Sequence, residues 1–142
     1  MQVSKNPGDN SFCGPAALSL LTGFHVSLCC HELRLINRKR AIKGCSNGDM
    51  TAALLRLGKR VREVPLHPNT LCVTKRTRPT LVGAVRLLKT RTPLQRFLIR
   101  TTDHFLVLQG RKVYDNRNPT GVFFGKYSHR RMRVKNVWEV SA

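Results

Sequence analysis

The chain has 142 residues, of which 41% are hydrophobic, and its 26 Lys and Arg against 7 Asp and Glu give a formal net charge of +19. This length fits one domain with one packed core, which we expect to span residues 1–142. No run approaches the roughly 20 apolar residues that a membrane-spanning helix needs, and no secretory leader is recognisable. We therefore expect a protein that is cytoplasmic, or packaged into a particle after synthesis there, with no membrane partner.

The basic residues are spread along the whole chain, with dense clusters at 38–40, 59–62, 75–78 and 130–133. Such a charge could simply keep a solvated surface soluble, but its size equally favours attraction to a polyanion. Candidate partners are nucleic acid, ribosomes, a packaged genome or an acidic protein substrate. The chain has nine aromatic residues, and none alternates with the basic clusters in the pattern typical of base stacking.

The first two thirds of the chain are predicted to be mainly helical. Small and apolar residues predict a helix over 12–22 that ends near Gly23, and a second helix is expected over 28–37. Residues 44–49 read as a loop, in which Ser46 and Asp49 have the spacing of a capping box for a third helix through Leu57. Gly58 is the expected C-terminal cap.

After that helix the pattern changes from helices towards strands. Alternation predicts a strand over 60–65, residues 67–74 look irregular, and a fourth helix is expected over 80–89. Runs rich in Val, Leu, Phe, Tyr and Ile, separated by turn residues, predict strands over 95–100, 104–109, 111–115 and 133–140. Helices followed by an antiparallel sheet indicate an α+β fold.

Cys13 is the first candidate for chemistry. It follows the turn-rich residues 6–10 and begins the first predicted helix, so its sulfur would face the positive end of the helix dipole. A cysteine works as a nucleophile in its thiolate form, which a helix N-terminus and a neighbouring imidazole favour. A lone cysteine at a helix start is more often a small buried hydrophobic residue.

A base and its orienting group are predicted from one hairpin. His104 opens a predicted strand, and Asp115 ends the next one after a tight turn at Gly110. The two side chains can therefore hydrogen-bond across adjacent strands, with Asn116 as the alternative orienting group. The simpler interpretation is a structural histidine and a turn-forming aspartate, and Asp103 beside His104 would cap a turn.

Three segments in this order resemble the papain-like cysteine peptidases, most closely the bacteriocin-processing and phage-encoded branch. Residues 10–23 read NSFCGPAALSLLTG and are similar to the helix that carries the family's nucleophile. Residues 44–58 (GCSNGDMTAALLRLG) resemble its middle helix, and residues 104–115 (HFLVLQGRKVYD) resemble its histidine hairpin. The short hairpin and the closing VKNVWEV at 134–140 look like small phage proteins of this type.

The resemblance implies a minimal papain-like fold, in which a helical half carrying Cys13 packs on an antiparallel sheet carrying His104 and Asp115. It implies a thiol hydrolase for a peptide or isopeptide bond, with Cys13 as nucleophile, His104 as base and Asp115 as orienting group, and with no metal or other cofactor. The alternative hypothesis is a weak or inactive relative that binds nucleic acid, a virion component or a host macromolecule through its basic surface.

The resemblance also implies an oxyanion hole. The family usually places a glutamine about six residues before the nucleophile, and Pro7 stands there in this chain, while Gln2 is too distant. Asn10 and Asn6 are the candidates to replace it, together with the backbone N–H of Cys13. One such donor is worth roughly 10²–10³ in rate.

The other four cysteines are expected to be free thiols. Five cysteines cannot all pair with one another, and nothing in the sequence indicates secretion. Cys29, Cys30 and His31, with Cys45, raise the question of zinc, but adjacent cysteines suit one tetrahedral site poorly and the usual second pair is missing. We therefore predict no metal site and a packing role for Cys72.

Overall fold

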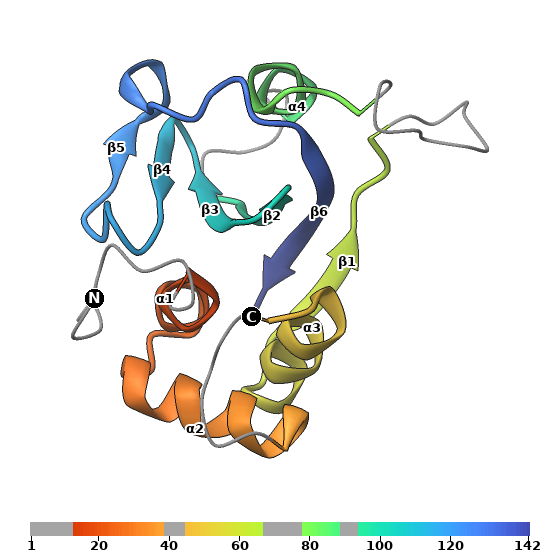
Figure 1. Cartoon of the computed structure of the whole chain (residues 1–142), viewed down its shortest axis with the longest axis vertical. Helices are drawn as coiled ribbons and strands as arrows, with labels where there is room; N and C mark the ends of the chain where they lie inside the picture. The colour runs from red at the N-terminus through yellow and green to blue at the C-terminus, as the bar shows by residue number, and fades with distance from the viewer. Residues whose placement is uncertain (1–12, 39–44, 67–77, 89–93) are drawn as a thin grey trace.

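A computed structural model describes residues 13–38, 45–66, 78–88 and 94–142, and all elements below belong to these ranges. The helices are α1 (Cys13–Thr22), α2 (Val26–Asn37), α3 (Asn47–Arg56) and α4 (Leu81–Leu88), with one 3-10 turn, η2 (Phe124–Lys126). The strands are β1 (Arg60–Glu63), β2 (Arg96–Thr101), β3 (Phe105–Gln109), β4 (Lys112–Tyr114), β5 (Val122–Phe123) and β6 (Val134–Ser141). The strands form one antiparallel sheet in the order β1-β6-β2-β3-β4-β5 (Figure 1).

The first two helices lie close to their predicted positions. α1 ends at Thr22, and Gly23 follows with φ +78°, a conformation that glycine adopts without steric cost. α2 begins two residues before its predicted start, because the His25 imidazole accepts a hydrogen bond from the backbone N–H of Ser27 at 3.1 Å and caps the helix.

The capping box predicted for α3 is confirmed. The Ser46 hydroxyl accepts from the backbone N–H of Asp49 at 3.1 Å, and the Asp49 carboxylate accepts from the backbone N–H of Ser46 at 3.4 Å. The helix therefore starts at Asn47, inside the segment predicted as loop. Gly58 follows the helix with φ +87°.

The predicted strands are present, with small shifts at their ends. β1 stops at Glu63, two residues before the predicted end of that strand, and β5 was not predicted. With two residues, β5 is too short to show a periodic pattern. The predicted irregular segment 67–74 lies outside the described residues.

The sheet is buried on both faces. Alternate residues of its central strands, such as Leu98 and Trp138, pack with α1, α2 and α3 in one hydrophobic cluster. Their neighbours, such as Ile99 and Val137, pack with α4 in a second cluster on the other face. The N-terminal helices thus pack on an antiparallel sheet in an α+β fold, as predicted, whereas the place of α4 on the opposite face was not predicted (Figure 1).

Among the described helices, none is long and apolar enough by itself to cross a membrane. α1 and α2 reach the required length and composition only when taken together across a bend of 116°. Both helices contribute residues to the first cluster.

Candidate active site

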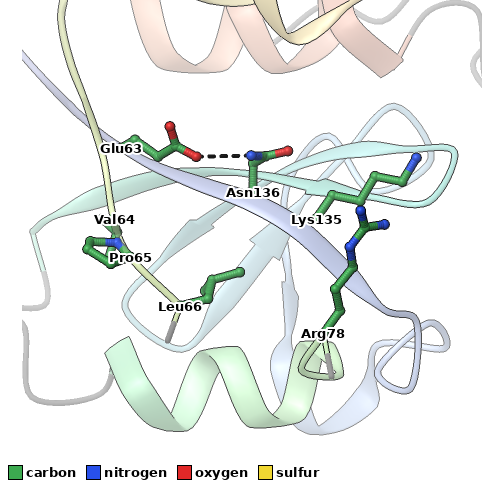
Figure 2. A pocket seen from close by; sticks show the side chains of 7 residues that line it. All are labelled: Glu63, Val64, Pro65, Leu66, Arg78, Lys135 and Asn136. Atoms are coloured by element: carbon green, nitrogen blue, oxygen red, sulfur yellow. Dashed lines mark hydrogen bonds between the residues drawn. The ribbon is translucent and has the colours of Figure 1, made fainter. Parts of the chain in front are cut away.

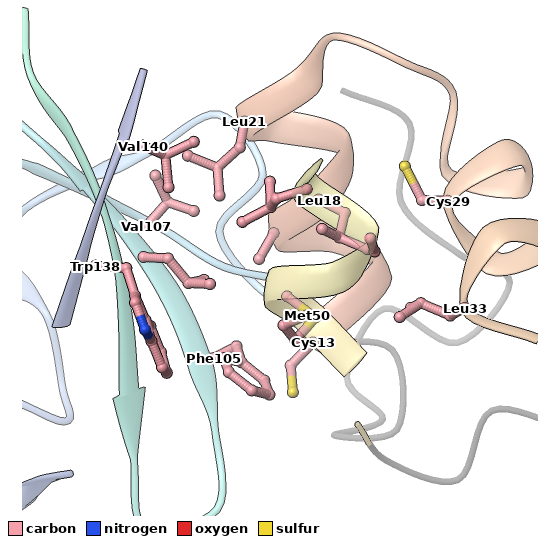
Figure 3. Packing of buried hydrophobic residues seen from close by; sticks show 14 residues of the cluster. Cys13, Leu18, Leu21, Cys29, Leu33, Met50, Phe105, Val107, Trp138 and Val140 are labelled. Atoms are coloured by element: carbon pink, nitrogen blue, oxygen red, sulfur yellow. The ribbon is translucent and has the colours of Figure 1, made fainter. Parts of the chain in front are cut away.

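Cys13 is the first residue of α1 and is 6% exposed. It belongs to the first cluster, at whose margin it lies near Met50 of α3 and Phe105 of β3 (Figure 3). The next residue, Gly14, allows this close packing, because a Cβ at that position would lie 2.8 Å from the sulfur of Cys45 and 3.2 Å from that of Met50. Because Gly14 has no side chain, the start of α1 can pack closely against the start of α3.

His104 lies in the turn between β2 and β3, directly before Phe105. Its carbonyl oxygen accepts two hydrogen bonds from Thr101, one from the backbone N–H at 2.9 Å and one from the hydroxyl at 3.2 Å. Thr101 is fully buried, so these bonds fix the backbone from which the imidazole projects.

The hydrogen bond predicted between His104 and Asp115 is present. Nε2 of His104 lies 3.0 Å from Oδ2 of Asp115, and since an ionised carboxylate can only accept, Nε2 is the donor. Asp115 directly follows β4, and β3 and β4 form the hairpin that brings the two residues together. Their side chains are 8% and 2% exposed, which shields the bond from water.

Four further hydrogen bonds fix the Asp115 carboxylate. The Tyr127 hydroxyl donates to Oδ2 at 2.8 Å. Oδ1 accepts from the backbone N–H of Arg117 at 3.0 Å, and from the backbone and side-chain amides of Asn118 at 2.7 and 3.0 Å. Burial alone would raise the pKa of Asp115, but the hydrogen bonds from His104, Tyr127 and Asn118 outweigh burial and hold this pKa well below its ordinary value.

The His104 imidazole carries the opposite shift. Burial alone would lower its pKa, but the hydrogen bond to Asp115 and the neighbouring Cys13 thiol raise the pKa to about 9. Nδ1 of His104 makes no hydrogen bond to any described residue. Nε2 is committed to Asp115, which leaves Nδ1 as the nitrogen available to Cys13.

The other three described cysteines, Cys29, Cys30 and Cys45, have raised pKa values. Burial is the largest cause in each case: it raises the pKa of Cys29 to about 11 and that of Cys45 to about 12, and it also raises the pKa of Cys30. Thiols of this kind stay protonated at neutral pH and react slowly. Cys72 lies outside the described residues.

Of the two candidates for the orienting group, Asp115 accepts the Nε2 proton of His104. Asn116 is buried beside it in the chain. Asp103 is exposed. The predicted oxyanion-hole candidates Asn10 and Asn6 lie outside the described residues.

Three groups that hold this site were not predicted from the sequence: Thr101, Asn118 and Tyr127. Asn118 stands in a turn-rich stretch, and its distance from Asp115 suits an Asx-type turn, so a signal for it exists. Tyr127 lies in a segment without periodicity. A buried tyrosine hydroxyl needs a partner, but the sequence offers no sign that this tyrosine is buried.

The described residues contain no group of three His, Cys, Asp or Glu side chains that could hold a metal ion. They do form a pocket of about 490 Å³ away from Cys13, His104 and Asp115. It lies beside the end of β1 and the beginning of β6 and includes Glu63, Arg78, Lys135 and Asn136 (Figure 2). No family model, curated protein or solved structure matches this chain.

Proposed function

We propose that this protein is a papain-like cysteine peptidase, phage-encoded, that cleaves a peptide or isopeptide bond through Cys13, His104 and Asp115. The observation that carries the proposal is the buried bond from Nε2 of His104 to Asp115, which leaves Nδ1 for a thiol at the first residue of a helix. A buried carboxylate on one ring nitrogen and a cysteine near the other are expected for a catalytic histidine, whereas a purely structural histidine does not require them.

The first half of the proposed reaction forms a thioester. The sulfur of Cys13 attacks the carbonyl carbon after Nδ1 of His104 has taken the thiol proton, and the carbonyl π electrons move to its oxygen. The tetrahedral intermediate then expels the amine as its C–N bond breaks, and Nδ1 returns the proton to the leaving nitrogen. Asp115 stabilises the imidazolium, as the pKa of about 9 for His104 indicates.

In the second half, water replaces the amine. Nδ1 of His104 removes a proton from water as the water oxygen bonds to the thioester carbon. The C–S bond of the resulting tetrahedral intermediate then breaks, and Nδ1 returns the proton to the sulfur, which releases the acid and the Cys13 thiol. The backbone N–H of Cys13 would donate to the oxyanion in both halves, with Asn10 or Asn6 as the candidate second donor. An amine in place of water would make the same residues a transferase.

The test is the rate at which a peptide-based thiol-reactive electrophile labels each cysteine, followed by mass spectrometry at neutral pH. We expect Cys13 to react much faster than Cys29 or Cys45, whose pKa values of about 11 and 12 keep them protonated. His104→Ala should slow the labelling of Cys13 by roughly 10²-fold or more.

His31→Ala is the matched control, because it removes an exposed imidazole from α2 and should leave the labelling rate unchanged. Equal reactivity of Cys13 and Cys45 in the folded wild-type protein would contradict a catalytic thiol.

A further inference from the structure

The acidic residues are unevenly distributed along the chain, and two long stretches that carry basic residues contain none. No Asp or Glu occurs in residues 64–102 or in residues 116–138. The described parts of these stretches supply α4 with the residues before it, and the segment from η2 to the start of β6. Their basic side chains therefore have no acidic neighbour in the sequence.

The fold joins these two stretches into one surface. The backbone N–H groups of Leu81 and Val82, at the start of α4, donate to the carbonyls of Met132 and Arg130 at 2.8 and 3.0 Å. In return, the backbone N–H of Val134 donates to Pro79 at 2.9 Å. These bonds place the start of α4 and residues 130–134 on one shared surface, on the side of the sheet opposite α1, α2 and α3.

Seven basic residues of this surface define what we call the α4 basic face. They are Arg78, Arg86, Lys126, Arg130, Arg131, Arg133 and Lys135. Arg86, Lys126, Arg130, Arg131 and Arg133 are exposed, and Arg78 and Lys135 are partly exposed.

None of the seven forms an ion pair with another described residue. Arg130 and Arg133 donate to the carbonyls of Gly125 and Arg78, both at 2.7 Å, and a neutral carbonyl leaves the charge uncompensated. The ion pairs between arginine and glutamate in the described residues lie elsewhere on the molecule: Arg56 pairs with Glu32 at 2.8 Å and Arg62 pairs with Glu139 at 2.7 Å.

The pocket lies at one margin of the α4 basic face. Arg78 and Lys135 line it together and extend beside each other (Figure 2). Glu63, on the far side of the same pocket, accepts a hydrogen bond from Asn136 at 3.0 Å. Two cations that share a pocket repel each other, so an anion between them would be stabilised by both.

We propose that the α4 basic face binds nucleic acid through its phosphate backbone, independently of the candidate active site. Adjacent cations without acidic partners suit a polymer with regularly spaced negative charges, and an acidic protein would need matched spacing of its carboxylates. Binding does not depend on base sequence, because the seven residues include no aromatic side chain for stacking.

The experiment measures the affinity of the full chain for a short fluorescein-labelled DNA duplex of random sequence by anisotropy, at salt concentrations from about 50 to 200 mM. If all seven cations contact phosphates, the slope of log K against log salt is about −6. The variant Arg86→Glu/Lys126→Glu/Arg131→Glu should reduce this slope by about 3 and weaken binding roughly 100-fold at 0.1 M salt.

The matched control is Arg34→Glu/Arg38→Glu/Arg60→Glu. Arg34, Arg38 and Arg60 are exposed residues of α2, its C-cap and β1, and like the test variant the control includes one arginine from the last turn of a helix. Arg111 is left unchanged, because it lies beside η2, where its carbonyl accepts from the backbone N–H of Phe124 at 2.8 Å. The control should lose less than about one unit of slope. Equal weakening by both variants would overturn the proposal in favour of net charge alone, and so would no binding by the wild-type protein at 50 mM salt.

Two further measurements separate the remaining outcomes. Polyglutamate that binds the same face more tightly than DNA would overturn nucleic acid as the ligand and identify an acidic protein surface instead. Labelling of Cys13 in the test variant should proceed at the wild-type rate, which shows that the variant is folded. The outcome of the labelling experiment and that of the DNA experiment are therefore independent.

Discussion

At the scale of single residues, the central feature is the sharing of the Asp115 carboxylate. Its Oδ2 accepts from both His104 and Tyr127, and its Oδ1 is held by Arg117 and Asn118. The hydrogen bonds on Oδ1 fix the plane of the carboxylate, and those on Oδ2 determine how much negative charge faces the imidazole. Tyr127 therefore affects the basicity of His104 through the carboxylate oxygen that both residues share.

The pH dependence of stability follows from the two opposite pKa shifts. The pKa of Asp115 is lowered from 3.8 in the folded protein. The stabilisation that Asp115 gives to the fold is therefore present above pH 3.8 and is lost as the pH falls below that value. The pKa of His104 is raised from 6.5 to about 9, so its contribution is complete below pH 6.5 and is lost as the pH rises through 9. The pair stabilises the fold most between pH 3.8 and 6.5.

Asp115→Asn should lower the pKa of His104 from about 9 to 6.5 or below, because the carboxylate is removed and burial continues to act. An NMR titration of the His104 Cε1–H resonance measures this change. The loss of unfolding free energy relative to wild type should be largest between pH 3.8 and 6.5 and should shrink towards pH 9. Asp103→Asn is the control, because it removes an exposed carboxylate one residue from His104 and should leave the titration unchanged. A His104 pKa that stays near 9 in Asp115→Asn would show that Asp115 does not cause the raised pKa.

Tyr127→Phe should shift the same resonance in the opposite direction. Without the tyrosine hydroxyl, Oδ2 of Asp115 has one donor fewer and accepts more strongly from His104, so the pKa of His104 should rise above its wild-type value. The lost hydrogen bond to a charged group should cost about 1.5–3 kcal/mol of unfolding free energy in urea. Tyr114→Phe in β4 is the control. An unchanged His104 titration in Tyr127→Phe would show that Tyr127 only packs at the site and does not affect the pKa of His104.

At the scale of elements, the site depends on how closely α1 approaches α3. The side chains nearest to Gly14 are those of Cys45, just before α3, and Met50 within α3. The capping box of Ser46 and Asp49 fixes where α3 starts and therefore where Cys45 lies.

Gly14→Ala should lower the unfolding free energy by about 1–3 kcal/mol, since the added methyl group would lie 2.8 Å from the sulfur of Cys45. In the Cys45→Ala background the same substitution should cost at least about 1 kcal/mol less, because the obstructing sulfur is gone. Urea unfolding of the four proteins in this double-mutant cycle provides the coupling energy. If the effects of Gly14→Ala and Cys45→Ala on the unfolding free energy were additive, the contact with the Cys45 sulfur would not be the reason that a side chain at position 14 is unfavourable.

At the scale of the whole molecule, residue patterns predicted the elements better than their arrangement. Caps and periodicity are local, so the helices, most of the strands and the hairpin that pairs His104 with Asp115 could be predicted from the sequence. The sheet order and the place of α4 depend on contacts between distant segments, which leave no periodic signal. Tyr127 was missed for the same reason, because its partner Asp115 lies 12 residues earlier in the chain, with β5 and η2 between them.

The sheet order also has a consequence for the sequence of events in synthesis. β6 is the last strand along the chain, yet it lies between β1 and β2 and pairs with both. As the chain leaves the ribosome, β2, β3 and β4 can pair locally and bring His104 to Asp115, while β1 still lacks its neighbour. The first cluster, which packs around Cys13, also requires Trp138 and Val140 of β6. Synthesis therefore supplies the histidine hairpin before the residues that complete the packing around the nucleophile, so the thiol acquires its final surroundings only when β6 has been made.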